Sequence, residues 1–203
     1  MAEFLKKQKG TIFINIMLKL KVEYRVYDVR LFSLKSFQQN PIMQLTELQK
    51  GLSLNTRKIV KFAEGLSREE ALFRPYDAVN NFTWNLGHIT TVRNTIIKLL
   101  DPTVKLDVYD NEKELFGNAS ALQANEAYPE LSIILGYFVK RGEQINELCG
   151  AVLDEHLEQV SAIKIGPDPR TNADLLWFFY NHECEHLGEM KILKNLANRL
   201  RNA

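Results

Sequence analysis

The chain has 203 residues, 45% of them hydrophobic and 25% charged, and its formal net charge of +1 does not favour a nucleic-acid-binding protein. Two cysteines are too few for a disulfide framework, and no apolar run approaches the roughly 18 residues of a transmembrane helix. These features argue against a disulfide-rich secreted scaffold and an integral membrane protein, so we expect a cytoplasmic protein that contacts neither membrane nor nucleic acid.

The first forty residues differ in pattern from the rest of the chain. Between Leu18 and Val26, apolar residues alternate with charged ones, which is the period-2 pattern of a half-buried strand. Residues 1–35 carry 8 Lys and Arg against 3 Asp and Glu, whereas the remainder carries 18 against 22. We interpret residues 1–40 as a basic, strand-like N-terminal arm. It can be a hairpin beside a helical domain, a dimer-forming arm, or upstream sequence without function that precedes a start near Met43.

The domain that we predict over residues 41–203 begins with helical spacing of apolar residues. The first helix extends from Met43 to a stop at Gly65. The sequence Ser67-Arg68-Glu69-Glu70 is a capping box that opens a short helix, which ends before Pro75.

The second long helix is predicted over Trp84–Leu100, with Asn81 or Thr83 as its N-cap. A long connection over residues 103–127 follows it, and within this connection residues 112–116 can form a helical turn.

The third helix is expected to hold Pro129 in its first turn and to carry an apolar stripe as far as Val152. A short helical turn is predicted at residues 154–159. Thr171-Asn172-Ala173-Asp174 then caps a fourth helix that runs to about Asn198. Four amphipathic helices with a long second connection predict an all-α, up-down-type four-helix bundle, a fold that commonly holds metal sites on facing helices.

Histidines are the main candidates for chemistry. His182 and His186 lie four residues apart in the fourth helix, so both imidazoles lie on one face and can bind one transition metal ion. The alternative is that one is a core histidine and the other a surface histidine.

His88 in the second helix would complete a set of three. Gly87 beside it lowers helix stability by roughly 1 kcal/mol relative to Ala, which makes sense where another group must approach closely. Three neutral imidazoles with open positions suit zinc, nickel or iron in a catalytic site. The alternative for His88 is a hydrogen-bonded core histidine. His156 lies in a charged turn that we interpret as solvated, and we leave it out of the site.

The segment from His182 to His186 also matches H-E-x-x-H, the zinc-protease signature in which Glu183 would be the general base. Such proteases take a third ligand further along the chain. Only 17 residues follow His186, and none of them is a histidine. We therefore do not predict a protease.

Two glutamates are candidates for catalysis. On a helical wheel Glu189 falls about 20° from His182 and Glu185 about 60° from it, so both can reach the histidine face. Each can act as a hydrogen-bond acceptor for a ligand, a fourth ligand or a general base. Cys184 falls about 200° away and is expected to pack rather than to bind metal.

The motifs Trp84-x-x-Gly87-His88 and His182-Glu183-x-x-His186-x-Gly188 occur in this order on the second and fourth helices. With this helix layout, residues 43–200 resemble the DinB-like (DinB/YfiT) superfamily of bacterial metal-binding four-helix bundles. The resemblance implies a divalent metal ion on His88, His182 and His186, and often a homodimer.

The same resemblance suggests a function, because similar proteins include bacillithiol S-transferases and mycothiol-dependent isomerases. It implies a metal-dependent thiol S-transferase or hydrolase that acts on a small molecule, with a low-molecular-weight thiol as possible co-substrate. Glu189 departs from the family pattern, where Gln is frequent, and its carboxylate would tighten metal binding, supply a base or repel a thiolate. The alternative is a non-enzymatic metal-binding or stress-induced interaction module that uses the basic arm as its contact surface.

Overall fold

The structure, a computed structural model, describes residues 41–76, 79–118 and 120–202, with side chains from Leu45 onward. The predicted arm of residues 1–40 lies outside the described residues. Within them the chain is helical, without strands and with one isolated β-bridge between Val160 and Thr171. The predicted all-α class is therefore confirmed.

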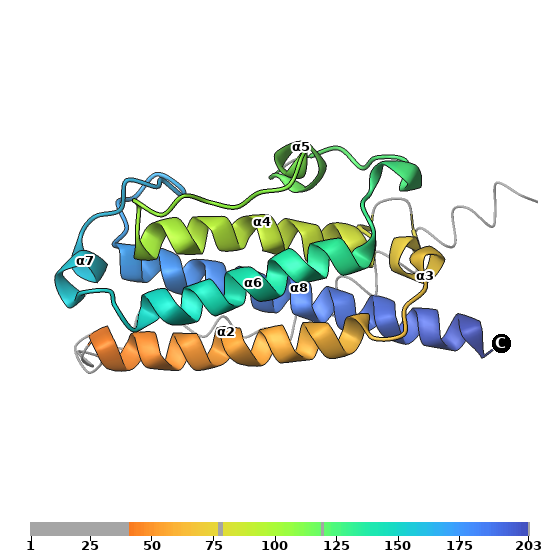
Figure 1. The fold of residues 1–203 in the computed structure, drawn as a ribbon, viewed down its shortest axis with the longest axis horizontal. Coiled ribbons are helices and arrows are strands. Elements are labelled where there is room, and N and C mark those ends of the chain that lie inside the picture. Colours follow the sequence, from red (N-terminus) through yellow and green to blue (C-terminus); the bar gives the residue numbers. More distant parts are fainter. Residues whose placement is uncertain (1–40, 77–78, 119, 203) are drawn as a thin grey trace, which may run out of the picture. The chain divides into compact units, whose positions relative to one another are not determined.

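Four long helices form a bundle (Figure 1). They are α2 (Pro41–Ala63), α4 (Phe82–Leu100), α6 (Leu131–Cys149) and α8 (Asn172–Arg201). Four short helices lie in the connections: α3 (Arg68–Leu72), α5 (Glu112–Phe116), the 3₁₀ turn η3 (Asn125–Ala127) and α7 (Asp154–Glu158). Both α4 and α2 pack against α6 and α8, so each helix has two neighbours in the bundle.

The long connection after α4 determines the directions of the helices. Residues 101–130 return along the length of the bundle, so α4 and α6 run in the same direction and α2 and α8 run opposite to them (Figure 1). One apolar cluster joins the beginnings of α2 and α8 to the ends of α4 and α6, and a second cluster joins the opposite ends. As a result, α4 and α8 are antiparallel neighbours.

Side-chain caps begin three of these helices, because the first backbone N–H groups of a helix have no partner within it. Ser67 and Thr171 form capping boxes at α3 and α8, as predicted. Of the two candidate caps for α4, Asn81 is the N-cap, and its side chain accepts a hydrogen bond from the Trp84 backbone N–H at 2.7 Å. Gly65, with a φ of +68°, follows the end of α2.

Two predicted helix ends differ from the structure. Pro129 precedes α6, whose N-cap is Glu130, so the prediction that Pro129 lies in the first helical turn is wrong. Glu130, with a φ of −59° and a ψ of 140°, is not helical, and the helix begins at Leu131, two residues after Pro129. α8 continues to Arg201, where the Arg201 guanidinium binds the Glu70 carboxylate of α3.

A buried arginine crosses the middle of the bundle. Arg93 of α4 is fully buried and donates to both carboxylate oxygens of Glu183 on α8, at 2.8 and 2.9 Å. It also donates to the Phe138 carbonyl of α6 and to the Thr56 hydroxyl of α2, each at 2.9 Å. One side chain thus connects all four long helices and fixes α8 one residue from His182.

None of the helices in the described part of the chain is both long enough and apolar enough to span a membrane.

Candidate metal centre

His88, His182 and His186 come together where α4 packs against α8. One potential ligand atom from each lies within 4.8 Å of the other two, and the Nε2 atoms of His88 and His182 are 3.0 Å apart. In a tetrahedral zinc site with Zn–N distances of 2.0–2.1 Å, two ligand nitrogens are roughly 3.3 Å apart. Among the described residues, this is the one cluster of three or more potential side-chain ligands whose ligand atoms all lie within 4.8 Å of one another. The three histidines chosen from the sequence are therefore brought together.

His88 is held with one ring nitrogen free. Its Nδ1 lies 2.8 Å from the Phe116 carbonyl oxygen, which can only accept, so Nδ1 carries the proton and Nε2 keeps its lone pair. The Trp84 ring stacks on the imidazole at 4.9 Å between centroids. Burial lowers the pKa of His88 most, the hydrogen bond to the Phe116 carbonyl opposes this, and the neighbouring His186 and His182 lower the pKa further. The net lowering favours the neutral imidazole that a metal ion needs.

Gly87 permits the approach of the group that holds His88. A Cβ added at Gly87 would lie 2.3 Å from the Phe116 ring, so a larger residue there would displace that ring. The predicted close approach at Gly87 is therefore present, and the approaching group is the last residue of α5.

A second buried ion pair anchors α5 to the bundle. Arg141 of α6 donates to both carboxylate oxygens of Glu112, at 2.6 and 2.7 Å, and both side chains are buried. The same guanidinium donates to the carbonyl oxygens of Thr90 and Asp107, at 2.8 and 2.7 Å. Glu112 begins α5 and Phe116 ends it, so this ion pair and the Phe116–Gly87 contact hold the helix at both ends.

His186 is oriented by two acceptors on its Nδ1. The amide oxygen of Asn85 lies at 2.8 Å and Oε2 of Glu189 at 2.9 Å. The Asn85 amide nitrogen donates to the Asn81 carbonyl, which leaves its oxygen facing His186. A proton on Nδ1 serves both acceptors and leaves Nε2 as the ligand atom, the arrangement typical of metal-bound histidines.

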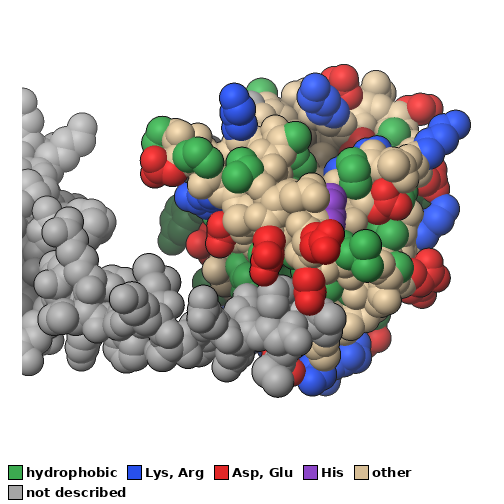
Figure 2. All heavy atoms as spheres, turned by 90° about the vertical axis from the view of Figure 1, so that its left-hand side faces the viewer, with side chains coloured by type: hydrophobic (Ala, Val, Ile, Leu, Met, Phe, Trp, Pro, Cys, Tyr) green, Lys and Arg blue, Asp and Glu red, His purple; other side chains and the backbone are tan. Residues whose placement is uncertain are grey.

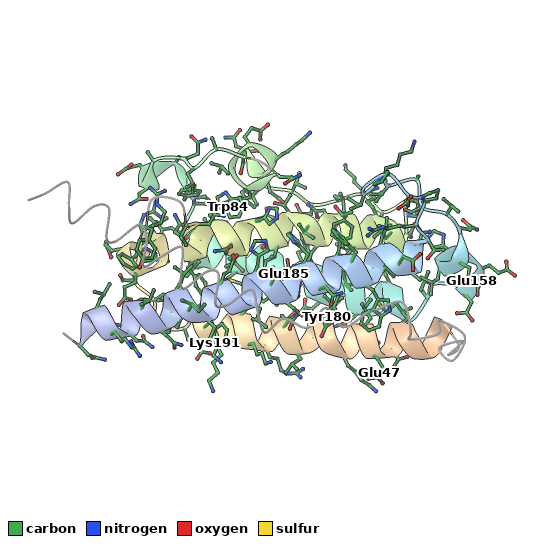
Figure 3. All side chains as sticks on the ribbon, turned by 180° about the vertical axis from the view of Figure 1, so that it is seen from behind. Glu47, Trp84, Glu158, Tyr180, Glu185 and Lys191 are labelled. Atoms are coloured by element: carbon green, nitrogen blue, oxygen red, sulfur yellow. The ribbon has the colours of Figure 1, made fainter. Side chains whose placement is uncertain are left out.

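The two candidate catalytic glutamates differ in their contacts. Glu189 accepts the hydrogen bond from His186, and this bond lowers the pKa of the Glu189 carboxyl. The Glu185 carboxylate is 3.8 Å from Nδ1 of His182, which is too long for a hydrogen bond. Burial and the neighbouring His186 lower the pKa of His182. Figure 3 shows Glu185 on the side of α8 toward α4, where Trp84 lies, whereas Tyr180 lies toward α2.

The remaining sequence candidates have structural contacts. Both oxygens of Glu183 bind Arg93 in the core, so Glu183 is not available as the base of a protease. Cys184 lies on the opposite side of α8, where its sulfur accepts a hydrogen bond from Asn55 of α2 at 3.4 Å.

His156 is outside the cluster, as predicted, and its turn exposes Glu155, Glu158 and Gln159, but the His156 side chain itself is partly buried. Its Nε2 lies 2.8 Å from the Leu99 carbonyl oxygen, so the imidazole ties α7 to the end of α4. Figure 2 faces this end of the bundle and shows several acidic side chains gathered on its surface. The prediction of a solvated turn was based on the charged neighbours of His156 in α7, whereas the imidazole itself points toward α4.

Apart from Glu189, sequence reasoning did not identify the groups that orient the ligands. Asn85 lies three residues before His88, so helical spacing places it on the same face and provides a usable signal. The Phe116 carbonyl has no such signal, because any residue carries one and the long connection has no periodic pattern.

A cavity of about 400 Å³ opens beside His88 and His182. Its walls come from α4, α5, α8 and the connection between α7 and α8. The histidine cluster therefore has space for a small molecule next to two of its three imidazoles.

Comparison with protein families matches residues 52–190 to the DinB superfamily. The match covers 139 of the 203 residues and includes all three histidines, Asn85 and Glu189. Comparison with curated proteins gives no match.

Proposed function

Because the chain belongs to the DinB superfamily, we propose that it binds a divalent metal ion through His88, His182 and His186. We further propose that the protein uses this ion to activate a thiol or a water molecule for reaction with a small-molecule substrate. The observation that supports this most is the convergence of three imidazoles beside a cavity of about 400 Å³.

The donor set fits such an ion. His88 and His186 each have a hydrogen-bonded Nδ1, and this leaves Nε2 as the ligand atom of a neutral ring. Three neutral histidine ligands leave positions open, which is typical of catalytic rather than structural zinc sites. When bound, the ion lowers the pKa of a coordinated thiol or water and so supplies a nucleophile near neutral pH.

Glu189 has the geometry of a proton acceptor at this site. Its Oε2 is bound to His186, and its other oxygen remains available. The carboxylate is ionised at neutral pH, so its available oxygen can take the proton that the nucleophile releases, although the bond from His186 lowers its pKa and so makes it a weaker base. Glu185, which has no hydrogen bond to a histidine, is the second candidate for this role.

Metal content tests the first half of the proposal. Full-length protein is loaded separately with zinc, nickel and ferrous iron, desalted and analysed for metal. Wild type should hold one ion per chain, and His182→Ala should hold none. His156→Ala is the matched control, because it removes a histidine outside the cluster and should keep the ion. Equal metal content in His182→Ala and wild type would refute the site.

Turnover tests the second part of the proposal, that the bound ion activates a thiol or a water molecule. Bacillithiol and glutathione are each assayed with an electrophilic aryl halide, and an aryl ester is assayed for hydrolysis, with and without chelator. Activity that is lost with chelator and in His182→Ala would support the enzyme, and the thiol or ester arm would identify the nucleophile. Metal binding without turnover would favour the alternative of a non-enzymatic metal-binding module.

A further inference from the structure

The cavity beside the histidine cluster is unusual in having walls without formal charge. Its described lining residues include no Asp, Glu, Lys or Arg. Six apolar side chains contribute instead: Val92, Phe116, Ile163, Ile165, Phe178 and Phe179. A volume of about 400 Å³ lies within the range of small-molecule binding sites, which are mostly apolar with a few polar groups.

These walls select against a charged ligand group. An ion moved from water into this cavity loses hydration, and in the metal-free protein no lining residue supplies a formal counter-charge, whereas each square ångström of apolar surface buried there contributes about 25 cal/mol. A neighbouring cavity of about 640 Å³ shows the contrast, because Asp110, Lys113 and Glu114 are among its lining residues. The two cavities share Thr91, Thr95 and Asn118, so they adjoin each other.

Apart from His88 and His182, the polar residues that line the first cavity lie on this shared border. The Thr91 hydroxyl donates to the Gly87 carbonyl at 3.0 Å, which leaves its oxygen able to accept a hydrogen bond from a ligand. Polar substituents can thus be bound at the border, and the interior is left to apolar groups.

From these contacts we infer that the cavity binds an uncharged aromatic or branched aliphatic group of the substrate, next to His88 and His182. This inference specifies the class of substrate for the proposed metal site. It rests on the proposed function only in calling the bound molecule a substrate. Binding of such a group depends on Phe116 and the apolar residues around it, and it does not require a metal ion.

Two matched fluorescent probes test the inference on full-length protein. N-phenyl-1-naphthylamine is uncharged, and 8-anilino-1-naphthalenesulfonate has the same ring skeleton with an added sulfonate. We expect the uncharged probe to bind wild type with one-to-one stoichiometry and at least tenfold more tightly than the sulfonate. Equal affinities for the two probes would overturn the inference.

Two isoleucine substitutions locate the probe. Ile165→Trp fills part of the cavity and should weaken binding of the uncharged probe at least tenfold. Ile192→Trp adds the same ring to an exposed position of α8 and should leave binding unchanged. Thr95→Asp, which places a carboxylate at the border, should also weaken the uncharged probe if Ile165→Trp does not fold. Unchanged affinity in a folded cavity variant would contradict the assignment.

The titrations are repeated with chelator-treated wild type. Probe binding as expected in a protein that takes up no metal would refute the proposed function and leave the cavity assignment intact. Metal uptake without the expected probe selectivity would refute the cavity assignment and leave the proposed metal site intact.

Discussion

Glu189 and Asn85 share the Nδ1 proton of His186, and Glu189 is the partner that carries charge. We expect Glu189→Ala to weaken metal binding about tenfold, because partners of a metal-bound histidine typically contribute 10- to 100-fold in affinity. Glu189→Gln keeps an acceptor oxygen and should therefore lose less metal affinity than Glu189→Ala. The measurement is a competition titration against a chromophoric chelator.

The control for Glu189 is another exposed acid on the same helix. Glu185→Ala removes the same charge without removing a hydrogen bond to a histidine, so its metal affinity should stay within about twofold of wild type. If both alanine variants lose the same affinity, the hydrogen bond to His186 is not the cause.

Gly87 links the metal centre to α5. An added Cβ would meet the Phe116 ring at 2.3 Å, and overpacking of this kind costs about 1–3 kcal/mol. Gly87→Ala should therefore lower the free energy of unfolding by about this amount and weaken metal binding, because the Phe116 carbonyl that holds His88 must shift. Denaturant unfolding and the same chelator titration measure both effects.

Gly136 of α6 provides a matched substitution, because no atom lies within 4 Å of its added Cβ. Gly136→Ala should raise stability by up to about 1 kcal/mol through helix propensity alone and leave metal affinity unchanged. A Gly87→Ala variant that behaves like Gly136→Ala would contradict the role of the Phe116 contact.

At the scale of the helices, the Arg93–Glu183 ion pair fixes α8 against the other three. Removing one partner of a buried pair leaves the other charge unpaired, which costs about 3–5 kcal/mol. We expect Arg93→Met to lower the free energy of unfolding by this amount in urea denaturation. The double variant Arg93→Met, Glu183→Leu should regain part of the loss, because no buried charge remains.

The exposed pair Lys140–Asp107 is the control for burial. Lys140→Met should change stability by at most about 1 kcal/mol, as is usual for surface ion pairs. Similar losses in Arg93→Met and Lys140→Met would contradict the claim that burial makes the central pair important.

The end of α8 is attached to α3 by a pH-dependent contact. The Arg201 guanidinium donates to the Glu70 carboxylate, and this bond, together with the Ser67 backbone N–H, lowers the Glu70 pKa from 4.5 to about 2. Because the folded-state pKa is below the unfolded value, the contribution is complete above pH 4.5 and is lost as the pH falls toward 2.

Glu70→Gln tests this pH dependence, because glutamine does not ionise. The stability difference between wild type and Glu70→Gln should be largest above pH 4.5 and should shrink as the pH falls toward 2. Thermal unfolding monitored by circular dichroism at several pH values measures it. A difference that stays constant across this range would show that the ionised carboxylate contributes nothing.

For the molecule as a whole, the sequence predicted the four helices and the pairing of His182 with His186 because both depend on local rules, whereas His88 lies 94 residues from His182 and was added as a third ligand by its residue type and by resemblance. Helical spacing places His182 and His186 on one face, and the capping residues Ser67 and Thr171 act within one turn. The position of Pro129 was misjudged because a proline suits both the first turn of a helix and the residues just before it.

The parts that could not be predicted depend on contacts between residues far apart in the chain. Arg93 meets Glu183 across 90 residues, and Arg141 meets Glu112 across 29 residues. The sequence does not show which charged residue each of them meets, and only the packed bundle shows that both pairs are buried. The carbonyl of Phe116 reaches His88 for the same reason, through a connection whose path has no periodic signal.

The most direct test of the metal centre is X-ray absorption spectroscopy of the zinc-loaded protein at the zinc K edge. We predict three imidazole nitrogens at about 2.0–2.1 Å from the metal in wild type, and at most two around any zinc that His88→Ala retains. The His156→Ala spectrum should match wild type. Fewer than three imidazoles in wild type, or a spectrum that is unchanged by His88→Ala, would contradict a site built from His88, His182 and His186.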